Sequence, residues 1–312
     1  MRREGKRSRM AHSGEFARLC GHSNVVTFAE KAIRQSYCDR MPHHANELHA
    51  MVGSIFQKLV ETCQSETKFA AALTHIQAHI LRTDEPGFWF TQAYRHYKRD
   101  VKPLRRFAHV EPWLVGRRVL DFGCGDGALA GLLHRKGYEI ALTDVLDYRD
   151  TEVRNLPFIR TEKPGIVPFA DQSFDTVLAL STLHHVDLAG LSSVLLGLRR
   201  VARRVVVEEE CYALPSNLVG MSAALAHDAL LREFVAMAPS DQLDYLMFLD
   251  YFGNVVMGGL QQINLPFQFK TVDDWQAIFA KHGFVVVQAL LLGFQLAYFH
   301  RSSYIWFALD TY

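Results

Sequence analysis

The stretch Val119-Leu-Asp-Phe-Gly-Cys-Gly-Asp-Gly-Ala-Leu-Ala130 decides the fold. It begins as a short apolar run, passes through Gly123, Gly125 and Gly127, and continues into a helix-forming run. This order predicts a strand, a tight turn and a helix, because glycine accepts backbone conformations that side chains oppose. A turn without Cβ atoms lets a ligand approach the backbone, and the start of the helix offers it free N–H groups.

Two carboxylates indicate which ligand this glycine turn binds. Asp121 lies two residues before the first glycine, where it would repel a pyrophosphate and attract a cationic group. Asp144 ends the next predicted strand, 17 residues beyond Gly127, and an acidic side chain there suits ribose hydroxyl groups. The pattern favours a ligand with a ribose, an ammonium group and no pyrophosphate, and S-adenosylmethionine has these features. The alternative is a turn that serves only strand–helix packing.

Downstream of the turn, short β-branched runs alternate with helical patterns. The predicted strands are 118–122, 140–144, 174–181 and 205–209, and the helical patterns between them include 128–136 and 188–201. Such alternation indicates βαβ units and a parallel sheet. Two further strands, 284–292 and 303–309, follow the N-cap residue Thr271 and its helix. The connection between these two strands is too short for a crossover, so they should pair antiparallel.

Three motifs in this order resemble class I S-adenosylmethionine-dependent methyltransferases. They are the glycine stretch, Ala141-Leu-Thr-Asp-Val145, and the segment Pro168-Phe-Ala-Asp-Gln-Ser-Phe-Asp-Thr-Val-Leu-Ala-Leu-Ser-Thr-Leu-His-His-Val186. The similarity is closest to the small-molecule group that includes quinone-biosynthesis enzymes, and it covers about 113–210 and 264–312. It implies a Rossmann-like, doubly wound α/β fold with a seven-stranded sheet and an antiparallel last strand. It also implies S-adenosylmethionine as cofactor, with S-adenosylhomocysteine as product.

The resemblance also assigns cofactor-binding residues. The methionine end of the cofactor would be surrounded by Asp121, Gly123 and Gly125, with Gly127 completing the turn. The ribose would be held by Asp144 and the adenine packed on Val145. The backbone beside the sulfonium would belong to Leu180 and Ser181. One departure is Lys163-Pro164-Gly165, which stands where such enzymes often carry an acidic residue and a small one against the adenine.

Candidates for the acceptor side follow the predicted strands, because ligands of open α/β sheets bind at the carboxyl ends of strands. His184 and His185 follow strand 174–181. They are candidates for a general base or a wall of the cofactor pocket. The alternative is a pair of histidines at a helix start that the backbone satisfies.

A second candidate is the acidic run Glu208-Glu209-Glu210, at the end of strand 205–209. Alternation places Glu209 on one face and its two neighbours on the other, either as a solvated rim or as functional carboxylates. The resemblance extends to this strand ending, to an Asp-x-x-x-Asn pair and to the stretch 264–275. Our hypothesis is that the polar part of an acceptor pocket consists of Glu209, Glu210, Tyr212, Asp250 and Asn254.

The rest of the chain predicts helical additions to this core. Residues 1–20 have a basic composition without apolar periodicity and are expected to form a disordered tail. Helical periodicity over 21–112 predicts an N-terminal lid or substrate domain, followed by a methyltransferase core over 113–312 with a helical insertion at 211–265. Residues 1–112 carry 18 basic and 11 acidic side chains, and the remainder carries 16 and 22. This division favours a basic lid on an acidic core.

Composition excludes several classes of protein. With 34 basic and 33 acidic residues, the chain lacks the charge of a polybasic nucleic-acid binder. Five scattered cysteines do not make a disulfide scaffold, and no apolar run reaches the ~18 residues of a membrane span. His75 and His79 lack the glutamate of a metalloprotease motif, so no metal site is expected. We expect a cytoplasmic protein with a small-molecule substrate, and a homodimer is compatible with the sequence.

Three functions fit this sequence. The leading one is methyl transfer to a small organic acceptor in natural-product or secondary metabolism. The second is a scaffold that binds the cofactor without methylation, or an enzyme that uses the sulfonium only electrostatically, because fold does not fix function. The third is an NAD-dependent oxidoreductase, against which Asp121 and the antiparallel C-terminal pair argue. Basic residues over 95–106 lie on a single helix, and we interpret them as a solvated face instead of a nucleic-acid surface.

Overall fold

The computed structural model describes residues 13–82, 85, 87–161, 166–260, 263–294 and 299–311. The chain divides into two compact units. The first, helical unit comprises 1–97, 229–267 and 294–302, and the second unit comprises 98–228, 268–293 and 303–312. The N-terminal helices up to Tyr97 and the later part of the predicted insertion therefore belong to one unit, whereas residues 98–112 of the predicted lid belong to the other unit together with the glycine turn.

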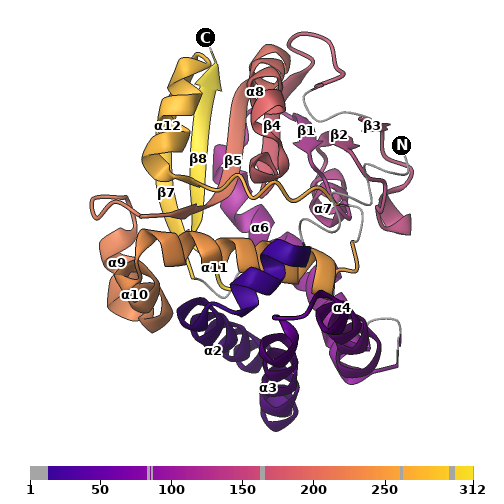
Figure 1. The fold of residues 1–312 in the computed structure, drawn as a ribbon. Helices are drawn as coiled ribbons and strands as arrows, with labels where there is room; N and C mark the ends of the chain where they lie inside the picture. Colours follow the sequence, from indigo (N-terminus) through magenta and orange to yellow (C-terminus); the bar gives the residue numbers. More distant parts are fainter. Residues whose placement is uncertain are drawn as a thin grey trace. The chain divides into compact units, whose positions relative to one another are not determined.

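The second unit contains a mixed sheet in the order β3-β2-β1-β4-β5-β8-β7 (Figure 1). Its strands are β1 (Arg118–Phe122), β2 (Glu139–Asp144), β3 (Phe158–Arg160), β4 (Phe174–Leu180), β5 (Ala202–Tyr212), β7 (Phe284–Gly293) and β8 (Tyr304–Thr311). Neighbouring strands from β3 to β5 pair parallel, whereas β8 pairs antiparallel with both β5 and β7. The predicted Rossmann-like α/β sheet of seven strands with an antiparallel last strand is confirmed.

The central strands form because their residues are apolar and buried on both faces. In β1 and β4, four of five and six of seven residues are buried, as expected for parallel strands covered by helices on both sides. Two strands escaped prediction because they are only three and two residues long: β3, and β6 (Lys270–Thr271), which pairs with the end of β5. Strands this short carry no measurable alternation.

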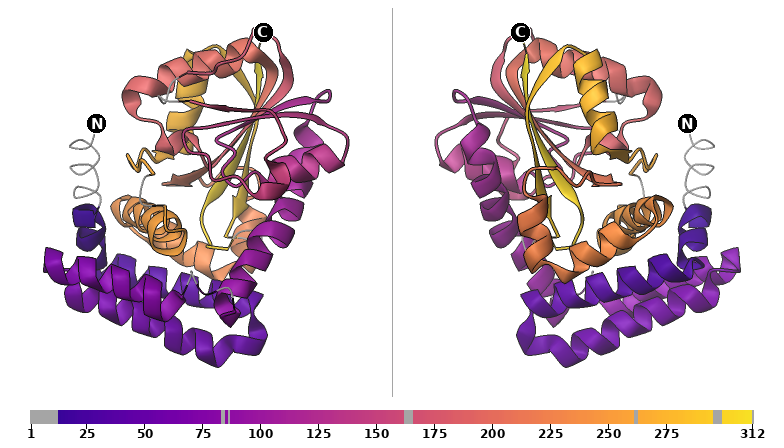
Figure 2. Two further views of the ribbon diagram at one scale, coloured as in Figure 1. Left: turned by 90° about the vertical axis from the view of Figure 1, so that its right-hand side faces the viewer. Right: turned by 90° about the vertical axis from the view of Figure 1, so that its left-hand side faces the viewer.

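Helices cover both faces of this sheet. Figure 2 shows α8 (Leu188–Val201) and α12 (Val272–Lys281) on one face, with α6 (Lys102–Val110) and α7 (Ala128–Arg135) on the other. Helix α12 begins at the predicted N-cap: the Thr271 hydroxyl accepts from the Asp274 N–H at 3.1 Å, and the Asp274 carboxylate accepts from the Thr271 N–H. This capping box satisfies two donors that the start of a helix leaves free. The short α9 (Met221–His227) completes the unit.

The first unit is helical in every described element. Its elements are α2 (Ser23–Arg40), α3 (Ala45–Thr62), α4 (Glu66–His75), α5 (Trp89–His96), α10 (Ala229–Ala236) and α11 (Pro239–Tyr251), with π-helical turns at 76–81 and 252–257. Apolar positions that the periodicity assigns to one face of α3, such as Leu48, Ile55 and Phe56, are buried. Among the described residues, no helix is both long and apolar enough to cross a membrane.

The expected basic tail falls into two parts. Residues 1–12 lie outside the described residues, while 13–20 are helical. This helix buries Phe16, whose ring stacks on Tyr251 with centroids 4.2 Å apart and also contacts Phe69. Leu19 and Cys20 are buried as well, and Arg18 pairs with Asp244 at 2.8 Å, so several side chains tie the segment to the helical unit, although it is too short to show apolar periodicity in the sequence.

Candidate active site

The glycine turn between β1 and α7 adopts a backbone that requires glycine. Gly123, Gly125 and Gly127 have φ angles of 73°, 59° and 75°, in the left-handed region that L-residues avoid. A Cβ atom on Gly123 would lie 2.3 Å from the Thr182 side chain, and one on Gly127 would lie 2.7 Å from Val153. The close approach of β4 and of the segment after β2 is therefore possible only without side chains at these positions.

Asp121, at the end of β1, is a buried carboxyl group facing a pocket. It is 5% exposed and lines the pocket together with Gly123, Asp126 and Leu180. Within the described part of the chain, its side chain makes no hydrogen bond and no ion pair. Burial raises the pKa of Asp121 to about 7, because removal from water disfavours the charged form. A buried carboxyl without a partner is costly unless a ligand supplies the partner.

Cations on α6 line the same pocket, and sequence reasoning missed them. Lys102 and Arg106 lie one turn apart on the helix and both border the pocket. Burial lowers the pKa of Lys102 to about 8. Lys98, one turn earlier, lies 3.4 Å from the carboxylate of Asp126. The i, i+4 spacing of these three residues was the available signal that one face of the basic segment points inward.

The other basic residues of this segment behave as the sequence suggested. Arg95, Arg99 and Arg105 are exposed. The solvated-face interpretation therefore holds for them, but not for the stripe of Lys98, Lys102 and Arg106.

The predicted ribose-binding residue, Asp144, lies at the end of β2. Its Oδ2 atom accepts from the Gly125 N–H at 2.9 Å and its Oδ1 atom from the Leu146 N–H at 3.1 Å. Burial raises its pKa. The carboxylate thereby fixes the glycine turn to the end of β2. Val145 is 37% exposed beside it, while Lys163-Pro164-Gly165, which departs from the family pattern, lies outside the described residues.

The end of β4 is held by an unusual backbone conformation. Leu180 is buried and lines the pocket, and Ser181 has a φ of 52°, in the left-handed region. The Ser181 N–H donates to the carbonyl of Glu208 at 2.7 Å, and its hydroxyl donates to the Glu208 carboxylate at 2.9 Å. Non-glycine residues in this region cluster at functional sites.

The acidic run at the end of β5 is not a solvated rim. Glu208 and Glu209 are both 0% exposed, and Glu210 is half-buried. Glu208 and Glu209 point to different partners, as alternation predicts, but Glu210 lies beside His184 together with Glu209 and not with Glu208. Glu208 reaches Arg106 on α6 at 2.9 Å, whereas Glu209 reaches the turn after β4. Burial was not predictable because these partners lie far away in the sequence.

Glu209 organises the turn that carries the two histidines. Its Oε1 atom accepts from the Thr182 N–H at 3.0 Å and the Leu183 N–H at 2.6 Å, and its Oε2 atom lies 2.6 Å from His184 Nδ1. A carboxylate can only accept, so His184 Nδ1 carries the proton. One buried side chain thus binds two backbone donors and sets the ring orientation of His184.

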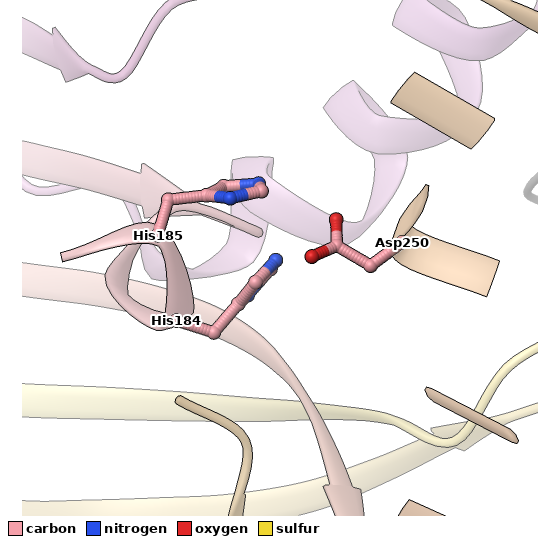
Figure 3. A group of neighbouring side chains, drawn as sticks. All are labelled: His184, His185 and Asp250. Atoms are coloured by element: carbon pink, nitrogen blue, oxygen red, sulfur yellow. The ribbon is translucent and has the colours of Figure 1, made fainter. Parts of the chain in front are cut away.

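The two histidines lie side by side on the 3-10 turn Leu183–His185 (Figure 3). Their ring centroids are 4.2 Å apart; His184 is buried and His185 half-buried. The Phe269 ring stacks on His184 with centroids 4.7 Å apart, and the Gln268 N–H donates to the His184 carbonyl at 3.2 Å. Part of the predicted stretch 264–275 therefore packs against this turn.

Within the second unit, the structure brings together three of the predicted acceptor residues, His184, Glu209 and Glu210. His184 Nδ1 lies 3.8 Å from Glu210 Oε2, and donor atoms of His184, Glu209 and Glu210 lie within 4.8 Å of one another, a set that could hold a metal ion. Tyr212, at the end of β5, is half-buried, and burial raises its pKa. Asp250 and Asn254 belong to the helical unit, where the Asn254 amide donates to the Asp250 carboxylate at 2.8 Å.

Comparison with known proteins adds independent findings. Residues 120–205 match the family described as "Methyltransferase domain". The ubiquinone biosynthesis O-methyltransferase of Paracidovorax citrulli is 32% identical over 111 residues, which cover 32% of this chain and 46% of that protein. The chain thus spans less than half the length of this curated relative.

Solved structures resemble the chain at lower identity. A possible histamine N-methyltransferase from Thermotoga maritima matches with a TM-score of 0.46 and 13% identity, covering 71% of this chain and 95% of that one. A methyltransferase from Methanosarcina mazei matches with a TM-score of 0.44 and 14% identity, covering 65% and 96%.

Proposed function

We propose that the whole protein transfers a methyl group from S-adenosylmethionine to a small organic acceptor, because residues 120–205 match the family described as a methyltransferase domain. The observation that carries this proposal is Asp121. A buried carboxyl without a partner, at the edge of a turn that excludes side chains, suits the ammonium group of an amino-acid ligand.

Other residues of the pocket, together with residues at the neighbouring strand ends, would hold the remaining parts of S-adenosylmethionine. Lys102 would hold its carboxylate, since Arg106 is already bonded to Glu208. Asp144 would accept from the ribose hydroxyls, and Val145 would pack on the adenine. The turn of Gly123, Gly125 and Gly127 and the backbone of Leu180 and Ser181 would form the wall around the methionine portion. When bound, S-adenosylmethionine supplies an electrophilic methyl group on a sulfonium sulfur.

The chain's own residues would act on the acceptor. A hydroxyl or amine that gains a methyl group has to lose a proton, and a positioned histidine can take it. His184 and His185 are the candidates, with Glu209 orienting His184 and Glu210 beside it. Tyr212, Asp250 and Asn254 are candidates for acceptor contacts. We further propose an acceptor from biosynthetic metabolism, as for the curated relative named for ubiquinone biosynthesis.

The test is product formation by the full chain. It would be incubated with methyl-labelled S-adenosylmethionine and a panel of phenols, catechols, amines and carboxylic acids. We expect S-adenosylhomocysteine and label in at least one acceptor class. Binding of the cofactor without S-adenosylhomocysteine in the presence of any acceptor or cell extract would instead support a non-methylating scaffold.

Cofactor affinity should be highest between about pH 7 and pH 8. Below about pH 7, Asp121 is protonated and loses its attraction for an ammonium group; above about pH 8, Lys102 loses its charge. Well below pH 7, the Kd for the cofactor should rise about tenfold for each pH unit. Calorimetric titration at pH 5.5 to 9 checks this. At pH 7 the binding enthalpy should also vary with the ionisation enthalpy of the buffer, because Asp121 releases a proton. A flat affinity over this range would contradict the role of both groups.

A further inference from the structure

The ion pair between Glu208 and Arg106 lies at the edge of the cofactor pocket. Glu208 is 0% exposed, and its Oε1 atom accepts from Arg106 Nη2 at 2.9 Å and from the Ser181 hydroxyl at 2.9 Å. Arg106 Nη2 also donates to the Ser181 hydroxyl at 3.3 Å. Arg106 and Leu180, the neighbour of Ser181, both line the pocket, whereas Glu208 does not. Glu208 therefore acts on the pocket through Arg106 and Ser181.

The charges around the pocket explain what this pair does. Asp121 and Asp126 supply two carboxylates, Lys98 pairs with Asp126, and Lys102 adds a further cation. An uncompensated guanidinium at Arg106 would put a second free cation beside Asp121. In a partly buried site, charges interact strongly, so this cation would oppose any positively charged ligand.

We propose that Glu208 is a specificity-determining residue of the cofactor site. By neutralising Arg106, it keeps the surroundings of Asp121 from becoming net positive, and so favours the sulfonium cofactor relative to its neutral thioether product. This inference rests on the proposed function, because it concerns S-adenosylmethionine and S-adenosylhomocysteine. The two molecules share the adenosine, the ammonium group and the carboxylate. They differ by the methyl group and its positive charge, so their affinity ratio reports the charge of the pocket.

The same pair positions the end of β4. Ser181 has a left-handed backbone, which is strained in a residue other than glycine. Three of its hydrogen bonds go to Glu208 and Arg106. Truncation of Glu208 would therefore disturb the backbone as well as the charge. Glu208→Gln is the better variant, because it keeps a side chain of the same shape and an acceptor oxygen.

The experiment measures Kd for S-adenosylmethionine and for S-adenosylhomocysteine by calorimetry on the full chain. Glu208→Gln is expected to lower the preference for the sulfonium by about tenfold. Arg106→Gln should shift the ratio in the opposite direction, since it leaves the Glu208 carboxylate unopposed. The double variant Glu208→Gln/Arg106→Gln should return the ratio to within about threefold of the wild type, because the charges are removed together.

A matched pair on the same strand provides the control. Arg204, near the start of β5, lies 2.5 Å from Asp310 on β8 and outside the pocket lining. Asp310→Asn is expected to leave the ratio unchanged. An unchanged ratio in both Glu208→Gln and Arg106→Gln, with both ligands still bound, would overturn the inference. Failure of the wild type to bind either ligand would instead overturn the proposed function. If either Glu208→Gln or Arg106→Gln does not fold, the shift of the affinity ratio in the other variant still tests the inference.

Discussion

Asp121→Asn should bind S-adenosylmethionine about 100-fold more weakly than the wild type, because a hydrogen bond from an ammonium group to a carboxylate contributes about 1.5–3 kcal/mol. The asparagine side chain keeps the shape of the aspartate and removes only its charge. Calorimetric titration at pH 8, where the wild-type carboxyl is ionised, measures this difference directly.

The same substitution should not destabilise the unliganded protein. The pKa of Asp121 is raised in the folded state from 3.8 to about 7. A raised pKa means that the folded state favours the protonated form of Asp121. This contribution to the free energy of unfolding is complete below the unfolded-state pKa, near pH 4, and is lost as the pH rises to about 7. The full shift corresponds to about 4 kcal/mol. We therefore expect the Tm of unliganded Asp121→Asn to equal or exceed that of the wild type at pH 8.

Asp126→Asn is the matched control for this prediction. Asp126 lines the same pocket, but its carboxylate is already paired with Lys98. Its replacement should change the affinity less than about fivefold, because Lys98 already compensates the charge of Asp126 and leaves it little to offer a ligand. Equal losses in both variants would mean that the pocket requires negative charge in general and that Asp121 is not the ammonium partner.

Glu209→Ala is expected to lower the free energy of unfolding by about 3–5 kcal/mol, because it leaves buried donors without their acceptor. These donors are the N–H groups of Thr182 and Leu183 and the Nδ1–H of His184. Urea unfolding followed by circular dichroism measures the loss. Glu210→Gln changes the next residue, which is half-buried. It should lower the free energy of unfolding by less than about 1 kcal/mol.

Glu209→Gln separates the structural role of Glu209 from its effect on His184. The amide oxygen of glutamine can still accept from the Thr182 and Leu183 N–H groups, so most of the stability should remain. Its NH₂ group, however, donates to His184 Nδ1 and forces the ring into the opposite tautomer. We expect ¹⁵N NMR of His184 to report this change and kcat to fall by more than about tenfold. Unchanged kcat with a changed tautomer would remove His184 from the proposed proton transfer.

The fold around the glycine turn could be predicted because the signal there is local. The strand, turn and helix of 119–130 lie within one stretch, and the positive φ angles at Gly123, Gly125 and Gly127 follow from residue type alone. Asp121 and Asp144 were placed by their position at the ends of predicted strands. The antiparallel pairing of the last strand could be predicted because the connection between strands 284–292 and 303–309 is too short for a crossover.

The remaining features depend on contacts between distant segments. Glu208 is buried because Arg106, 102 residues earlier, supplies a counter-charge, and Glu209 because Thr182 and Leu183 supply N–H donors. No periodicity encodes such pairings. Helical periodicity likewise shows that Lys102 and Arg106 share a face, but not that this face meets the glycine turn. The division of residues 211–265 between the two units also depends on tertiary packing.

The central claim is that the pocket beside Asp121 accepts an adenosine ligand with an ammonium group and without a pyrophosphate. Calorimetric titration of the full wild-type chain at pH 7.5 with S-adenosylmethionine, and separately with NAD, tests it most directly. We expect saturable binding of S-adenosylmethionine with one ligand per chain and no measurable heat of binding with NAD. Binding of NAD without binding of S-adenosylmethionine would contradict it.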